Sequence, residues 1–222
     1  MTRPGHGHRK RKAGPRPSPG WLSAVVANAR GEIVDLEGFA AVGADGPLRE
    51  PLSTGNTIAM PHGSELMYLP DRVPVMMNLA NGRIGPVERH PDGSGEEIFP
   101  VAAFNSPGVV LTHTCAYEER SDAAMLPLFS YGAVGWQPDG FRSAAMVVDT
   151  EPRQDLRRMP REKIVSGVAG MRTRLPGNRL ARHLEHCALA YGCPAGKNFF
   201  LGRYEAPLPT ARACNARCIG CI

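Results

Sequence analysis

The sequence is poor in aromatic residues and lacks several common functional motifs. Phe, Trp and Tyr make up 6% of the 222 residues, so we expect no stacking platform for single-stranded nucleic acid. There is no H-E-x-x-H motif, no Gly-rich phosphate loop and no Ser/His/Asp arrangement. No apolar run is long enough to span a bilayer, and residues 1–20 lack the apolar stretch of a secretory signal. We therefore expect neither a membrane protein nor a member of these common hydrolase and nucleotide-binding classes.

Cysteine is present at six positions. Without a secretory signal, this usage predicts a reducing, cytoplasmic location. In such a compartment cysteines serve as metal ligands or buried thiols rather than as a disulfide framework.

The positive charge is concentrated at the start of the chain. The net charge is +5, and residues 1–20 contribute +6 because they hold six Lys and Arg and no acid. The remaining residues hold 20 basic and 21 acidic side chains. This near-neutral body predicts no basic groove and argues against a nucleic-acid partner. Residues 1–20 have almost no apolar side chain to bury, so we expect a disordered basic tail.

Residues 21–150 are expected to form a β-rich domain, because short apolar runs alternate with turn residues. Its sheet is expected to be antiparallel and folded on itself. A hairpin is predicted around Pro138-Asp139-Gly140, which supplies the residues that a tight turn requires. The expected strands are Trp21–Ala27, Ile33–Leu36, Thr57–Met60, Val73–Leu79, Ile98–Phe104, Val109–Thr114, Tyr131–Trp136 and Phe141–Val148.

Residues 151–205 are expected to form a helical connector. One helix is predicted from about Pro160 to Arg174, and a second from its N-cap Asn178 to Gly192. These helices would cover a face of the sheet or connect the sheet to the last segment of the chain. Two short strands, Asn198–Leu201 and Leu208–Ala213, are predicted after them.

Three cysteines lie within eight residues near the end of the sequence. Cys214, Cys218 and Cys221 have the spacing C-x3-C-x2-C. Three thiolates on one loop can bind three irons of a cubane cluster and leave the fourth iron open, whereas an electron-carrying cluster uses four cysteines. Two alternatives remain: structural zinc with Cys193 or His186 as a fourth ligand, or part of a ferredoxin-like electron carrier.

This cysteine loop resembles the ligand loop of the radical S-adenosylmethionine (radical SAM) superfamily. The resemblance implies a [4Fe–4S] cluster on Cys214, Cys218 and Cys221, with S-adenosylmethionine bound at the open iron and cleaved reductively to a 5′-deoxyadenosyl radical. It also implies an electron donor such as a ferredoxin or flavodoxin. Gly220 stands where the superfamily usually has an aromatic residue before its third cysteine.

The strand-rich and helical segments together predict an α+β chain. The resemblance implies that residues 206–222 are the first strand and cluster loop of a truncated (α/β) radical SAM partial barrel. A looser similarity to a poorly characterised bacterial group of this superfamily includes Pro176–Leu180 and extends back to about Trp21. We therefore expect the N-terminal part of a radical SAM enzyme that is inactive alone. Its substrate is unknown, and a peptide or another protein is one possibility.

The other three cysteines lie outside this loop, and we interpret them mainly as buried thiols. His183 and Cys187 lie four positions apart, which suits a second metal site, and Cys193 follows nearby. Cys187 also lies on the apolar stripe of its helix, which favours a buried thiol. Cys115, in a strand-like run beside His113, is predicted to pack in the core.

Overall fold

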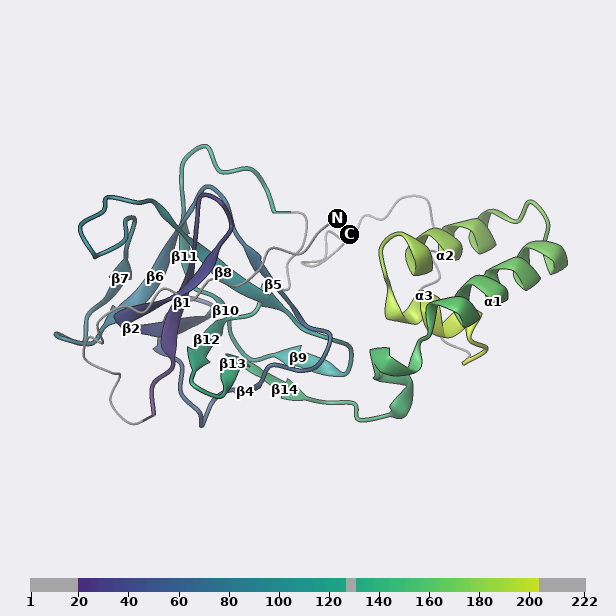
Figure 1. Ribbon diagram of the computed structural model, residues 1–222, viewed down its shortest axis with the longest axis horizontal. Helices are drawn as coiled ribbons and strands as arrows, with labels where there is room; N and C mark the ends of the chain where they lie inside the picture. Colours follow the sequence, from purple (N-terminus) through teal and green to yellow (C-terminus); the bar gives the residue numbers. More distant parts are fainter. Residues whose placement is uncertain (1–19, 127–130, 204–222) are drawn as a thin grey trace.

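The computed structural model describes residues 20–126 and 131–203, which form a strand-rich α+β structure (Figure 1). The strands are β1 (Ser23–Asn28), β2 (Ile33–Asp45), β3 (Leu48–Pro51), β4 (Ile58–Ala59), β5 (Glu65–Tyr68), β6 (Arg72–Asn78), β7 (Ile84–Pro86), β8 (Ile98–Phe104), β9 (Val109–Leu111), β10 (Thr114–Cys115), β11 (Tyr117–Glu119), β12 (Val134–Gln137), β13 (Gly140–Ser143) and β14 (Ala145–Val147). The helices are the 3₁₀ turns η1 (Pro152–Gln154) and η2 (Leu156–Arg158), followed by α1 (Arg161–Arg174), α2 (Arg179–Leu189) and α3 (Pro194–Phe200). We refer to residues 21–150 as the sheet unit and to residues 151–203 as the helical unit.

Strand β1 lies at the centre of the sheet. It pairs with β2, β8 and β12, and all of these pairings are antiparallel, as predicted. Its last five residues, Ala24–Asn28, are buried, which is typical of a strand covered on both faces. Among the described residues, the strands form a twelve-stranded sheet and the separate ribbon β9–β14.

Strand β2 is much longer than the predicted Ile33–Leu36. Its first half pairs with β1 and its second half with β3 and β10, so one strand contributes to two parts of the sheet. Gly43 lies in this second half, where an added Cβ would come within 2.7 Å of the His113 Cβ. The lack of a side chain therefore allows β10 and the residue before it to lie close to β2.

The hairpin β12–β13 confirms the predicted turn. Gln137 and Gly140 face each other at its end, and Gly140 has a φ of 133°. Trp136 and Phe141 are cross-strand partners whose rings meet at a steep angle with centroids 4.8 Å apart. This aromatic pair stabilises the register that the turn sets.

A buried arginine fixes the segment after β11. Arg72 is 2% exposed, and its guanidinium donates to the carbonyl oxygens of Pro70 (2.9 Å) and Ala124 (2.7 Å) and to the carboxylate of Glu119 (3.0 Å). Its carbon Cζ lies 5.5 Å from the centre of the Tyr117 ring. One side chain therefore joins the start of β6 to β11 and to the segment beyond it.

Changing Arg72 to Lys is expected to lower the free energy of unfolding by about 2 kcal/mol. A single ammonium group cannot reproduce the fork that reaches two carbonyls and a carboxylate. Thermal unfolding measures the loss, and hydrogen exchange should show faster exchange in residues 120–126. Arg49→Lys, at an exposed strand position, is the control. Equal stability of Arg72→Lys and the wild type would contradict the structural role assigned to Arg72.

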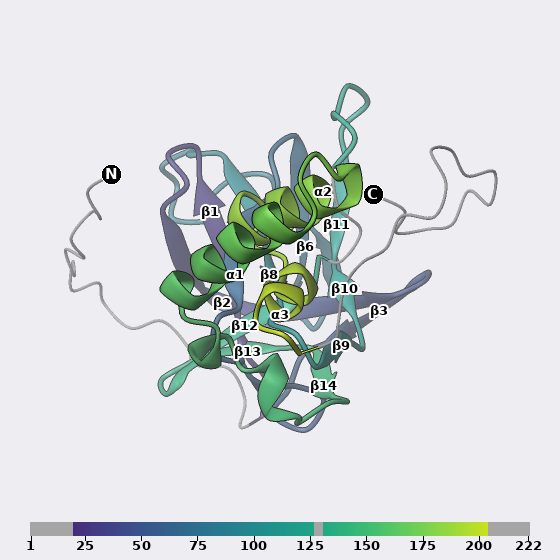
Figure 2. The ribbon, with the colours of Figure 1, turned by 90° about the vertical axis from the view of Figure 1, so that its right-hand side faces the viewer.

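The helical unit has a hydrophobic core of its own. Its buried residues come from η2–α1, α2 and α3, and the partly buried residues around them belong to the same segments. Figure 2 shows α1 and α2 side by side with α3 crossing beneath them. The helices thus pack against one another rather than over a face of the sheet. The buried set is Met159, Ile164, Val168, Leu184, Ala188 and Phe200.

The helix boundaries confirm part of the sequence prediction and correct another part. Asn178 is the N-cap of α2, and its side-chain oxygen accepts a hydrogen bond from the Ala181 amide at 3.0 Å. The predicted strand Asn198–Leu201 is wrong, because residues 194–200 form α3. Pro194 begins this helix at a position that needs no amide hydrogen. The predicted strand Leu208–Ala213 lies outside the described residues.

The connection between the two units runs through η1 and η2. Leu156 of η2 contacts the sheet unit at Gly63, because a Cβ added to Gly63 would come within 2.6 Å of the Leu156 side chain.

Within the described ranges, no helix has both the length and the apolar character needed to cross a membrane.

Candidate functional site

The three cysteines of the predicted cluster loop are not among the residues that the structure describes. Cys214, Cys218 and Cys221 belong to residues 204–222. The geometry of the loop therefore stays a prediction. What the structure describes is the helical unit, which ends at Arg203, eleven positions before Cys214.

The end of the described chain is held by a buried amide. The Asn198 side chain is fully buried and donates to the Arg153 carbonyl at 3.2 Å. Its oxygen accepts from the Arg203 guanidinium (3.1 Å), which also donates to the Arg158 carbonyl (2.6 Å). These bonds fix the exit of the chain from α3 against η1 and η2.

Cys187 is buried in the helical unit, as its place on the apolar stripe predicts. Its Sγ lies 3.4 Å from Nε2 of His183, and its carbonyl accepts a hydrogen bond from the Cys193 amide at 2.9 Å. Burial raises the pKa of the Cys187 thiol, and the nearby Cys193 adds to this rise. Across the described part of the chain, no group of three His, Cys, Asp or Glu side chains is placed to bind a metal ion.

Cys115 packs in the core of the sheet unit, as predicted. Its thiol lies 3.4 Å from the Val101 carbonyl oxygen, and burial raises its pKa to about 12. A thiol with this pKa is protonated at neutral pH and is a poor metal ligand. Cys115 is therefore a suitable control position for metal binding elsewhere in the chain.

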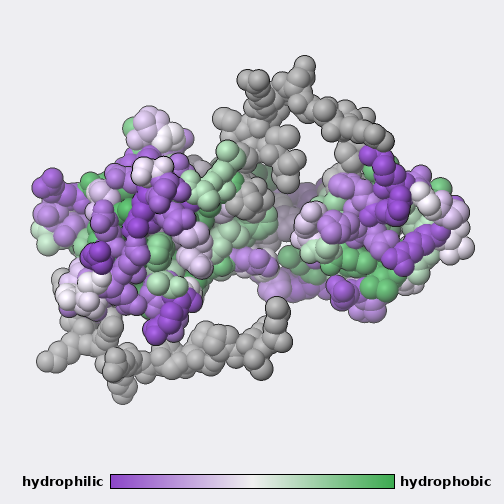
Figure 3. Space-filling model, turned by 90° about the horizontal axis from the view of Figure 1, so that it is seen from above, coloured by the Kyte–Doolittle hydropathy of each residue, from purple (hydrophilic) through white to green (hydrophobic). Residues whose placement is uncertain are grey.

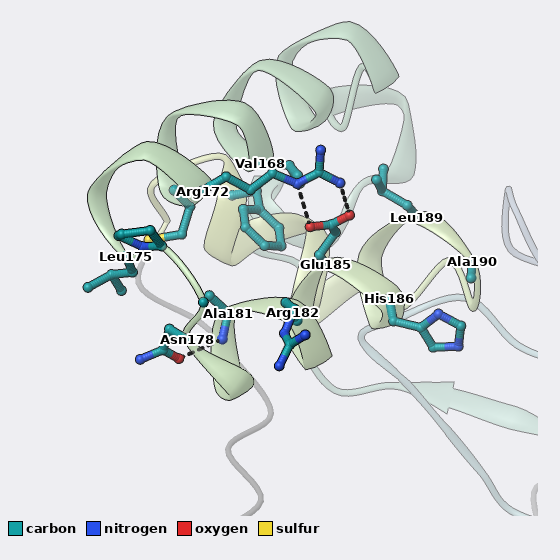
Figure 4. A pocket seen from close by; sticks show the side chains of 14 residues that line it. Val168, Arg172, Leu175, Asn178, Ala181, Arg182, Glu185, His186, Leu189 and Ala190 are labelled. Carbon is teal, nitrogen blue, oxygen red and sulfur yellow. Dashed lines mark hydrogen bonds and ion pairs between the residues drawn. The ribbon is translucent and has the colours of Figure 1, made fainter.

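A groove runs between α1 and α2 (Figure 4). Its volume is about 640 Å³, within the range of ligand sites in proteins. Val168 and Phe200 line it and are buried, and Met171 and Leu189 add half-buried apolar surface. The groove is thus apolar at its floor.

An ion pair crosses this groove. The Arg172 guanidinium of α1 binds both carboxylate oxygens of Glu185 on α2, with Nε to Oε2 at 2.9 Å (Figure 4). This hydrogen bonding lowers the pKa of Glu185, so its carboxylate remains charged and paired at neutral pH. Arg182 and His186 also line the groove and are exposed.

The two units carry opposite charge, which the near-neutral total conceals. The sheet unit holds 7 Lys and Arg against 16 Asp and Glu, a net charge of −9. The helical unit holds 11 against 4, a net charge of +7. Figure 3 shows hydrophilic residues over much of the surface of both units. Counting charge separately on each side of the predicted boundary at residue 150 would have revealed this basic surface from the sequence.

Comparison of the chain with protein-family models, with curated proteins and with solved structures finds no significant match.

Proposed function

We propose that this chain carries the cluster-binding loop of a radical SAM enzyme. The observation that supports the proposal is the spacing of Cys214, Cys218 and Cys221 in the sequence. Three thiolates are the donor set that an iron–sulfur cubane requires when one iron is kept open for another ligand. When bound, the cluster would supply the electron that reduces S-adenosylmethionine. The three cysteines would bind and orient it.

Two features of the described residues support this proposal. Asn198 and Arg203 anchor the chain at the end of α3, eleven positions before Cys214. Cys115 and Cys187, both buried with raised thiol pKa values, compete poorly for iron. The cysteines of the loop are thus the proposed ligands.

Anaerobic reconstitution of the full chain with iron and sulfide tests this proposal. We expect about four irons and four sulfides per chain, with broad charge-transfer absorbance in the visible range. Adding S-adenosylmethionine should change the electron paramagnetic resonance spectrum of the reduced cluster, because it would bind the open iron. Stoichiometric zinc without sulfide would instead identify a structural metal site. Loss of the cluster on replacing a fourth cysteine outside the loop would indicate an electron carrier, whose cluster uses four cysteines.

A further inference from the structure

The polar face of α2 is basic along its whole length. Arg179, Arg182, His183 and His186 have the spacing i, i+3, i+4, i+7, so they lie on one face of the helix, and all four are exposed. Among the described residues, neither Arg179 nor Arg182 has an ion-pair partner. This face is the most regular part of the basic surface of the helical unit.

The α1–α2 groove lies beside this face. Arg182 and His186 belong both to the basic face and to the lining of the groove (Figure 4). Along α2 the lining extends from Asn178 to Ala190, which corresponds to about 18 Å of helix. The groove therefore suits an elongated ligand that inserts apolar side chains.

We infer that the α1–α2 groove and the basic face of α2 form a docking site for an acidic peptide segment with apolar side chains. The apolar side chains would fill the groove above Val168 and Phe200. The carboxylates would lie against Arg179 and Arg182, and both kinds of contact would act on the same segment. Glu185 presents no obstacle, because Arg172 already neutralises its charge.

Two other classes of partner fit these observations less well. An anionic membrane would need the apolar face of α2, but Leu184 and Ala188 on that face are buried within the helical unit. A nucleic acid would use the basic side chains through its phosphates but would leave the apolar groove unfilled. The peptide is the partner that uses both features. The inference does not depend on the cysteine loop and is tested without iron.

The test measures the fluorescence anisotropy of a labelled peptide as the full chain is added. The peptide has about 14 residues, with Leu at i, i+3, i+4 and i+7 and Glu elsewhere. We expect binding that weakens several-fold between low and moderate salt, because the charges are exposed. The double variant Arg179→Glu/Arg182→Glu should bind at least about tenfold more weakly. The matched control is Arg161→Glu/Lys163→Glu, which makes the same change of charge on the first turn of α1, outside the groove. It should change binding less than about twofold.

Two comparisons distinguish binding in the groove from simple charge attraction. The same peptide with Ser in place of Leu should bind weakly, and Ala181→Phe, which places a ring in the groove, should weaken binding of the Leu peptide. Absence of binding, equal binding of the Ser peptide, or an equal effect of the two double variants would overturn the inference. Tighter binding of a duplex RNA would assign the face to nucleic acid. Self-association removed by Arg179→Glu/Arg182→Glu would assign it to a second copy of the chain. Either outcome would also overturn the inference.

Discussion

Changing Cys214, Cys218 or Cys221 individually to Ala is expected to abolish the reconstituted iron–sulfur cluster. Each thiolate binds one iron, and a loop with two thiolates leaves two corners of the cube without a protein ligand. Iron should fall from about four per chain to the background of a chain without the loop cysteines. The measurement is iron and sulfide content together with the visible absorbance.

Cys115→Ala and Cys187→Ala provide the matched controls. Both remove a thiol that is buried and has a raised pKa, so iron content should be unchanged in each. Cys193→Ala distinguishes the alternatives, because Cys193 is a candidate fourth ligand of structural zinc. Loss of metal in Cys193→Ala, with full retention in one of the three loop variants, would contradict the proposed ligand set.

Changing Gly167 to Ala is expected to destabilise the helical unit by about 2–3 kcal/mol. A Cβ at this position of α1 would come within 2.1 Å of the Phe200 carbonyl oxygen. The obstacle is backbone, so α1 and α3 would have to separate and would disturb the core formed by Val168 and Phe200. Circular dichroism at the helical band monitors this unit, because the helices of the described residues all lie between Pro152 and Phe200.

Gly170→Ala is the control in the same helix. An added Cβ at Gly170 meets no atom within 4 Å, so this change should stabilise the helix by roughly 0.5–1 kcal/mol through reduced backbone entropy of the unfolded chain. The two substitutions are chemically identical, but they should change the free energy of unfolding in opposite directions. If both variants were more stable than the wild type, the close contact between α1 and α3 would be absent.

The strands that the sequence predicted well are those with strong local signals. Ile98–Phe104 agrees with β8 at both ends, and the turn at Pro138–Gly140 places β12 and β13 correctly. Short strands such as β3 and β11 were missed, because each is partly polar, and β11 is also held by a neighbour distant in sequence. β11 pairs with β6. Such pairing depends on tertiary context more than on intrinsic preference.

The error at residues 198–201 has a similar origin. Two adjacent phenylalanines suggest a strand, but Phe200 is buried among Ile164, Val168 and Leu184 of the preceding helices. Gly196 assists this packing, since a Cβ there would lie 3.1 Å from the Ala188 amide nitrogen. Helix packing at glycine positions therefore decided the structure of a segment whose local preference was ambiguous.

The predicted and the newly found sites differ in the kind of signal that reveals them. The loop of Cys214, Cys218 and Cys221 is a local motif and can be found in one sequence. The groove needs α1 and α2 to be placed side by side, and no local pattern predicts that Arg172 reaches Glu185 thirteen positions later. The basic face of α2 was visible as a spacing, but the near-neutral charge of residues 21–222 as a whole concealed it.

The connectivity of the sheet has a consequence for the order in which the chain folds. Ser23 of β1 pairs with Trp136 of β12, so the central strand acquires one of its neighbours only after more than a hundred further residues have been synthesised. The core of the helical unit draws on one continuous segment, from Leu156 to Leu201, and such local contacts form fast. Although it is made after the sheet unit, the helical unit is therefore expected to reach its native structure while the sheet is still closing. During synthesis β1 has to remain without its β12 partner, and this interval is when the chain is most exposed to misassembly.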